Sequence, residues 1–138
     1  MDKIFAIFID KIFKYILPKE LEKILTLSGI ERQLDAMSLI IWSRIKYSKW
    51  QLVLGDFIRS NAKQDGLFEE GSKRTTVRGK QAKHPLGKAF DLYYVSGKRI
   101  LEYHEAPYKA LGEEWIRRGN IWGGSWKVPF DPGHFEFK

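Results

Sequence analysis

Two short strings in the C-terminal half of the chain contain residues that can hold a metal ion and hydrolyse a bond. In the first string six residues separate His84 from Asp91, and in the second two residues separate Asp131 from His134. Together they supply two imidazoles and one carboxylate for a metal, and a further carboxylate beside the second histidine. A hydrolytic zinc site needs this inventory, because it uses three protein ligands, an open position for water and a nearby base.

Each string also has an ordinary structural interpretation. Alone, His84 would be a surface or capping histidine, Asp91 a helix cap or the partner of a basic side chain, and residues 131–133 a common turn. The chain has 3 histidines, and two of them lie in strings of this form, which favours a site. The third, His104, is interpreted as a surface residue. Cysteine is absent, so a metal would be held by His, Asp or Glu.

Helices dominate the first part of the chain. Apolar residues at helical spacing predict an amphipathic helix over residues 2–16, and Pro18 is suited to the first turn of a second, short helix that Gly29 would close. Ser28 and Glu31 form the pattern of a capping box, which predicts a third helix reaching about residue 48.

Short strands and one further helix follow, and they would position the two strings. Strands are predicted at 51–54, 89–95, 99–101, 121–122 and 134–137, and a helix is predicted over 107–118. This order predicts an α+β fold, in which one domain has a small antiparallel sheet that holds the zinc site and is preceded by N-terminal helices. We expect residues 1–30 to be a helical extension and residues 31–138 to be the catalytic domain.

The net charge of +7 favours attraction to a polyanion such as nucleic acid, an anionic membrane surface or an anionic cell wall, although a basic surface can also be simply solvated. Lysine and arginine are spread along the chain and no nucleic-acid-binding signature stands out, so we expect no nucleic-acid partner. We also expect the protein to be a monomer. The N-terminal helix is expected to pack on the rest of the chain; the alternative is a peripheral membrane contact through its apolar face.

The ordered motifs resemble one known family. Residues 84–91 match the pattern H-x-x-G-x-A-x-D, Asp131-x-x-His134-Phe135 matches a second motif, and Gly123-Gly124-Ser125-Trp126 matches a G-G-x-W just before it. Residues 54–60 with Gln64, and the helix at 108–115, follow the same order. The chain from about residue 34 to 137 is thus similar to the peptidoglycan-cleaving zinc peptidases, the D-alanyl-D-alanine carboxypeptidases and L-alanyl-D-glutamate endopeptidases, and most of all to their phage endolysin branch.

The resemblance implies a role for each site residue. His84, Asp91 and His134 would be the zinc ligands, and Asp131 would be the general base. Arg59 would bind a substrate carboxylate or stabilise the oxyanion, for which its fork of donors and permanent charge are suited. Trp126 would form a wall of the substrate groove, with a place in the core as the alternative. The chain departs from the family at Ala82, where a serine is common.

These roles predict zinc-dependent hydrolysis of the peptide stem of peptidoglycan, as an L-alanyl-D-glutamate endopeptidase of the endolysin type. A D-alanyl-D-alanine carboxypeptidase is the close alternative, and a zinc-containing module that only binds cell wall or polyanion is the second. Because Asp10 and Lys11 interrupt the apolar N-terminal stretch, no secretory signal or membrane span is predicted. We therefore expect a protein made in the host cytoplasm that reaches the wall or periplasm after the membrane is permeabilised.

Overall fold

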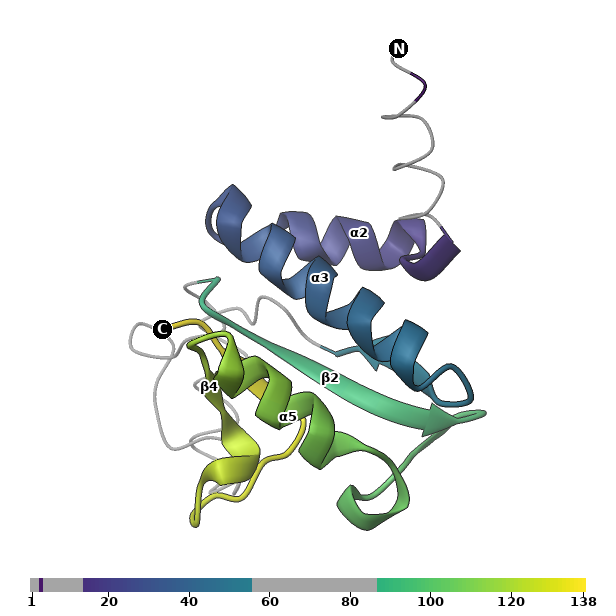
Figure 1. Cartoon of the computed structure of the whole chain (residues 1–138), viewed down its shortest axis with the longest axis vertical. Coiled ribbons are helices and arrows are strands. Elements are labelled where there is room, and N and C mark those ends of the chain that lie inside the picture. Colours follow the sequence, from purple (N-terminus) through teal and green to yellow (C-terminus); the bar gives the residue numbers. More distant parts are fainter. Residues whose placement is uncertain (1–2, 4–13, 56–86) are drawn as a thin grey trace, which may run out of the picture.

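The protein has an antiparallel sheet with helices on one of its faces (Figure 1). The structure is a computed structural model that describes residue 3 and residues 14–55 and 87–138. The described α-helices are α2 (Pro18–Leu25), α3 (Ile30–Lys46) and α5 (Tyr108–Arg117). The described strands are β1 (Gln51–Leu54), β2 (Ala89–Ser96), β3 (Arg99–Ile100), β4 (Ile121–Trp122) and β5 (His134–Glu136). Two short 3₁₀ helices, η1 (Tyr103–Glu105) and η2 (Gly123–Ser125), lie among them. The predicted α+β single domain with a small antiparallel sheet is confirmed.

Strand β2 is the centre of the sheet. The strands are ordered β1-β2-β5-β4, β3 also pairs with β2, and every described pairing is antiparallel. Side chains of a strand alternate between its two faces. On one face of β2, Phe90 packs against Trp115 of α5 and Tyr94 packs against Tyr108. The opposite face carries Asp91, so the sheet separates the aromatic core from the residues that could do chemistry.

Helix α2 belongs to the same core as the sheet. Its Ile24 is fully buried in one cluster with Leu39 of α3 and Leu52 of β1. The guanidinium of Arg44 contacts the carboxylate of Glu20 at 2.8 Å and donates a hydrogen bond of 2.7 Å to the carbonyl of Leu52. One mostly buried side chain of α3 therefore ties α2 to the edge of the sheet. The domain boundary expected at residue 30 stays a prediction, and most of the predicted helix at 2–16 lies outside the described residues.

The predicted capping box at Ser28 is wrong. Helix α3 begins at Ile30 with Gly29 as its N-cap, and no side chain caps it. Gly29 has a φ of 86°, a conformation that glycine adopts readily, and the amide of Ser28 instead donates to the carbonyl of Gly87 at 3.3 Å. The backbone amide of Ser28 therefore binds the segment just before β2, and Ser28 does not cap the helix.

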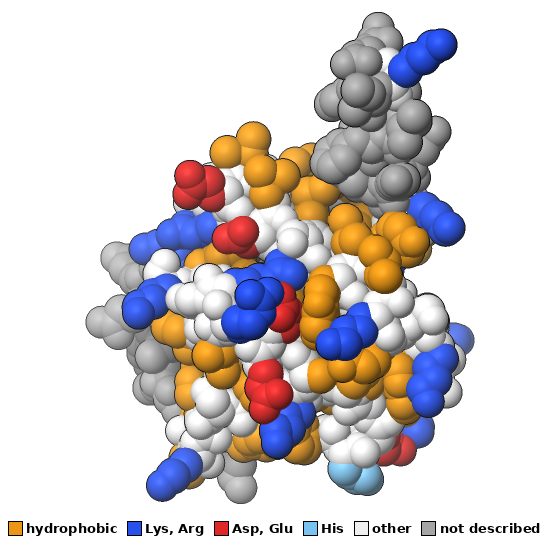
Figure 2. Space-filling model, viewed as in Figure 1, with side chains coloured by type: hydrophobic (Ala, Val, Ile, Leu, Met, Phe, Trp, Pro, Cys, Tyr) orange, Lys and Arg blue, Asp and Glu red, His pale blue; other side chains and the backbone are white. Residues whose placement is uncertain are grey.

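Apolar side chains gather on the surface of the helical layer (Figure 2). Exposed large hydrophobic residues of α2, its N-cap and α3 are Leu17, Leu25, Ile30, Leu34 and Ile45, and Ile116 of α5 is also exposed. Lysine and arginine side chains are dispersed over the same view of the molecule. Among the described helices, none has both the length and the apolar character that crossing a membrane requires.

Candidate active site

Asp91 and His134 are brought together by the pairing of β2 with β5. They are directly opposite one another in the antiparallel register, although their positions in the chain differ by 43. Residues opposed in this way project from the same face of a sheet. The Nδ1 atom of His134 lies 3.2 Å from Oδ1 of Asp91, and both side chains are about nine-tenths buried. Two of the predicted zinc ligands therefore meet at one point.

The neighbouring residues of these strands hold the pair in place from the other face. Phe135 stacks on Phe90 with ring centroids 5.7 Å apart, and both rings are fully buried. Because Phe135 faces the core, the alternation of the strand directs His134 to the opposite face. The indole of Trp115 donates a hydrogen bond of 3.0 Å to the backbone carbonyl of Glu136, which fixes the end of β5.

A second carboxylate contacts the other ring nitrogen of His134. Oε1 of Glu136 lies 3.1 Å from Nε2, and its side chain is 14% exposed. Burial by itself lowers the pKa of His134, but the hydrogen bonds and negative charges of Asp91 and Glu136 outweigh it and raise the pKa to about 9. The motif analysis assigned Glu136 no role. The available signal was its position two residues after His134 on a predicted strand, which places both on one face.

Asp131 lies in a tight turn immediately before β5. Its Oδ1 accepts a hydrogen bond from the amide of Gly133 at 3.2 Å, and its carbonyl accepts one from the amide of His134 at 3.2 Å. The Asp131 amide donates to the carbonyl of Gly123 at 3.1 Å. A side chain at position 123 would collide with the backbone of Asp131, so glycine is needed there for this approach. The predicted base is thus held by backbone bonds on both sides.

Residues 123–126, the G-G-x-W motif, support the same turn. The ring of Trp126 lies over that of His134 with centroids 5.2 Å apart, and the Trp126 side chain is partly exposed. The indole of the buried Trp122 donates a hydrogen bond of 2.9 Å to the carbonyl of Pro132. Trp126 therefore borders the candidate site directly, while Trp122 braces the turn from beneath.

Two predicted site residues, His84 and Arg59, lie outside the described residues. Asp91, Asp131, His134 and Trp126 are described, and they gather at the β2–β5 pairing and the turn before it. His104 lies in η1, where its exposed ring is 3.7 Å from the carboxylate of Glu102. Its interpretation as a surface residue is in keeping with this exposure.

The described donors fit a zinc ion. Imidazole nitrogen and carboxylate oxygen are both common zinc ligands, and two ligands of a tetrahedral ion, each about 2.0–2.2 Å from it, are roughly 3.3 Å apart. The 3.2 Å between Nδ1 of His134 and Oδ1 of Asp91 agrees with that spacing. In the described parts of the chain, no three His, Asp or Glu side chains are grouped as a metal site. The third predicted ligand, His84, falls outside those parts.

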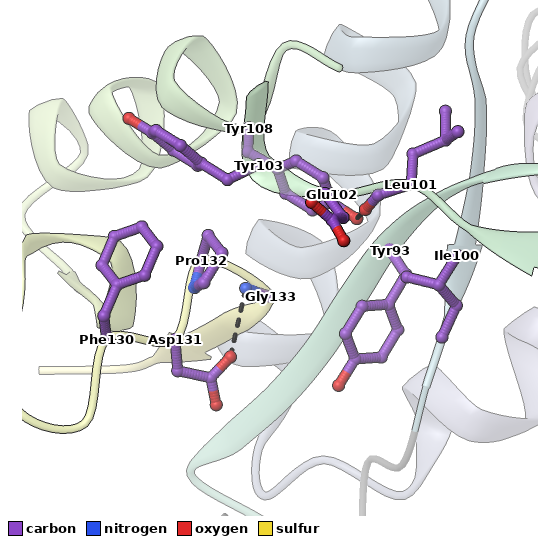
Figure 3. A pocket seen from close by; sticks show the side chains of 10 residues that line it. All are labelled: Tyr93, Ile100, Leu101, Glu102, Tyr103, Tyr108, Phe130, Asp131, Pro132 and Gly133. Carbon is purple, nitrogen blue, oxygen red and sulfur yellow. Dashed lines mark hydrogen bonds between the residues drawn. The ribbon is translucent and has the colours of Figure 1, made fainter. Parts of the chain in front are cut away.

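A groove of about 310 Å³ lies beside the turn (Figure 3). The ten residues that line it are mostly aromatic or apolar, with two carboxylates: Tyr93, Ile100, Leu101, Glu102, Tyr103, Tyr108, Phe130, Asp131, Pro132 and Gly133. In Figure 3 the side chains of Asp131 and Glu102 both lie at the open space between the β2–β3 hairpin and the turn. A substrate segment in this groove would lie next to the predicted base. The motifs did not predict that tyrosines would line the groove.

Comparison with known proteins supports the resemblance. The sequence model of a family described as D-alanyl-D-alanine carboxypeptidase matches residues 75–137, a range that includes all three predicted ligands and Asp131. The fold is similar to the crystal structure of Serratia marcescens L-Ala D-Glu endopeptidase ChiX, with a TM-score of 0.52 and 21% sequence identity over 94% of this chain and 85% of that one.

The structural comparison shows that the fold is shared. The family model covers the residues of both motifs, in the order in which they occur in this chain. The resemblance of the chain to the peptidoglycan zinc peptidases, the family of D-alanyl-D-alanine carboxypeptidases and L-alanyl-D-glutamate endopeptidases, is confirmed.

Proposed function

We propose that this protein is a zinc-dependent endopeptidase that hydrolyses the L-alanyl-D-glutamate bond in the peptide stem of peptidoglycan, in the manner of an endolysin. The observation that carries the proposal is the buried pair of Asp91 and His134, 3.2 Å apart, beside the turn that presents Asp131. A purely structural metal site needs neither a base nor an adjacent groove. This argues against a module that only binds cell wall or polyanion.

In this proposal His84, Asp91 and His134 hold the zinc ion. When bound, zinc supplies Lewis acidity, which polarises the scissile carbonyl and makes water a better nucleophile at neutral pH. Asp131 takes the proton of the attacking water at its carboxylate and passes it to the leaving amine. The amide of Gly133 donates a hydrogen bond of 3.2 Å to Oδ1 of Asp131, which helps to orient this carboxylate for proton transfer.

Arg59 and Trp126 would act on the substrate. Arg59 is proposed to neutralise a substrate carboxylate or the developing oxyanion. The partly exposed ring of Trp126, next to His134, would bound the peptide on one side. The aromatic groove on the other side of Asp131 would receive the neighbouring part of the stem. The positive net charge would favour approach to an anionic wall, so added salt should weaken that approach.

The family whose sequence model matches residues 75–137 is described as D-alanyl-D-alanine carboxypeptidase, which favours a second activity, the removal of the terminal D-alanine. Both reactions would use the same zinc ligands and the same base. They differ in which peptide bond of the substrate is placed at the zinc site. We further propose that residues 1–30 are an extension to the catalytic domain, and that the protein works at the wall or periplasm as a monomer.

The test is mass spectrometry of defined tetrapeptide and pentapeptide muropeptides incubated with zinc-loaded protein and with a chelated control. A zinc-dependent fragment that begins at D-glutamate supports the endopeptidase. Loss of only the terminal D-alanine from the pentapeptide supports the carboxypeptidase instead, and no cleavage refutes both.

Asp131→Asn tests the base in the same assay. It should abolish turnover and leave the zinc content unchanged, because Asn keeps the oxygen that accepts from Gly133 but cannot take the proton. Glu113→Gln is the matched control, since Glu113 is an exposed acid on α5. Wild-type activity of Asp131→Asn would refute the assignment of the base.

A further inference from the structure

The environment of His134 is asymmetric, and this asymmetry carries an inference that rests on the proposed zinc site. Its Nδ1 faces Asp91, itself a predicted ligand, whereas its Nε2 faces Glu136, which has no part in the motifs. A histidine that binds a metal through one ring nitrogen usually donates the other N–H to a carboxylate, carbonyl or water, which fixes the tautomer and the orientation of the ring. Glu136 has the chemistry and the position for that task.

The strand geometry makes this contact a property of the fold. His134 and Glu136 are two residues apart on β5, so both project from the same face. The Glu136 backbone is paired with Ala89 on one side and Ile121 on the other, and its carbonyl accepts the hydrogen bond from Trp115. The backbone of Glu136 is therefore held in place, and Oε1 of its side chain lies 3.1 Å from Nε2 of His134. The Glu136 side chain is 14% exposed.

We propose that Glu136 is a positioning residue for the metal ligand His134. Its carboxylate accepts the Nε2–H bond and so keeps Nδ1, on the side of Asp91, as the nitrogen available to the metal. Trp126 limits the motion of the ring from one side, and Glu136 sets its rotation and its tautomer. Without Glu136 the imidazole could carry its proton on Nδ1, the nitrogen that faces the metal. That proton would have to move to Nε2 before Nδ1 could bind the metal.

The experiment measures zinc affinity by competition with a chromophoric chelator, for wild type, Glu136→Ala and Glu136→Gln. Loss of this kind of outer contact typically costs 10–100-fold in metal affinity, so Glu136→Ala should bind zinc about 10–100-fold more weakly. Glu136→Gln keeps an acceptor oxygen and should lose only a few-fold on the same argument. Glu113→Ala removes the same charge from an exposed position and is the control, with unchanged affinity expected.

A second readout separates positioning from a general effect on the fold. In ¹⁵N-edited NMR spectra of the zinc-loaded protein, the His134 ring should carry its proton on Nε2, and that proton should exchange with solvent faster in Glu136→Ala. The His134 signals are assigned by comparison with spectra of His104→Gln and His84→Gln, which identify the signals of the other two histidines. Should Glu136→Ala fail to fold, the wild-type tautomer and the affinity of Glu136→Gln still decide the matter.

The outcomes are distinct. Zinc bound equally well by wild type and Glu136→Ala, or a His134 ring protonated on Nδ1 in the zinc-loaded protein, would overturn the role of Glu136 while leaving the zinc site intact. Equal losses in Glu136→Gln and Glu136→Ala would also overturn it, because they would show an effect of charge alone. Failure of the wild-type protein to bind zinc would instead refute the proposed function.

Discussion

Gly133→Ala is the substitution that most directly tests the link between close packing and the candidate site. Gly133 lies between Asp131 and His134, and its carbonyl accepts a hydrogen bond of 2.9 Å from the amide of Leu92 on β2. A Cβ at this position would lie 2.5 Å from Cε1 of Tyr93 and 3.2 Å from the carbonyl oxygen of Leu92. The added methyl therefore meets both a side chain and the backbone of the central strand.

The size of the effect follows from these distances. Ordinary contact begins at 3.4 Å, so the ring of Tyr93 and the turn would have to separate by about 0.9 Å. The ring cannot simply retreat, because its other edge is packed closely against Gly55. Overpacking of this kind destabilises a protein by about 1–3 kcal/mol. Alanine also lowers the conformational entropy of the unfolded chain, which stabilises the folded state by roughly 0.4–1 kcal/mol, because Gly133 does not have a positive φ. We expect a net loss of about 1–2 kcal/mol.

Two assays measure the consequence. Urea unfolding followed by tryptophan fluorescence should show a midpoint lower by roughly 0.5–1 M, given a urea dependence of about 1–3 kcal/mol per M. Hydrolysis of the muropeptide should fall by up to about 100-fold, because a displacement near 1 Å of groups beside the reacting atoms has costs of that order. The proposed function is assumed only in the second assay.

A double-mutant cycle with Tyr93→Ala identifies the cause. If the ring is the obstacle, Gly133→Ala should cost much less stability in the Tyr93→Ala background. An unchanged unfolding midpoint for Gly133→Ala would refute the packing argument altogether. An equal loss in both backgrounds would show that the carbonyl of Leu92, not the ring, is the obstacle.

Two further substitutions test the supports of the fold. Tyr108→Phe removes a buried hydroxyl that donates to the carbonyl of Leu101 at 2.9 Å and accepts from the amide of Tyr94 at 3.0 Å, so it should lower the free energy of unfolding by about 1–3 kcal/mol in urea titrations, with Tyr47→Phe as the control. The hydrogen bond from Arg117, aided by Arg118, lowers the pKa of Glu114 to about 2 from an ordinary 4.5 although burial opposes the shift. The stability that this group contributes is present above pH 4.5 and is lost as the pH falls towards 2, so Glu114→Gln should flatten the acid side of the stability profile; an unchanged profile would contradict this.

Local patterns predicted the elements more accurately than the contacts between them. The strand at 51–54 and the helix over 107–118 were found because alternation and helical periodicity are properties of adjacent residues. The cap at Ser28 was mispredicted because its competitor, the carbonyl of Gly87, is 59 residues away in the chain and invisible to a local pattern. The same limit explains why the groove tyrosines, which come from β2 and from around η1, were not anticipated.

The candidate site shows where motif and geometry each contribute. The family resemblance assigned Asp91 and His134 as metal ligands, but neither sequence string requires these residues to be opposite one another. The register of β2 and β5 places them opposite one another. The register is in turn set by the core, because Phe90 must face Phe135 for both rings to be buried beneath Trp115. A slip of one residue would turn His134 into the core and expose Phe135. The apolar residues between the motif positions thus select the pairing that brings the polar ones together, and the same alternation places Glu136 beside His134.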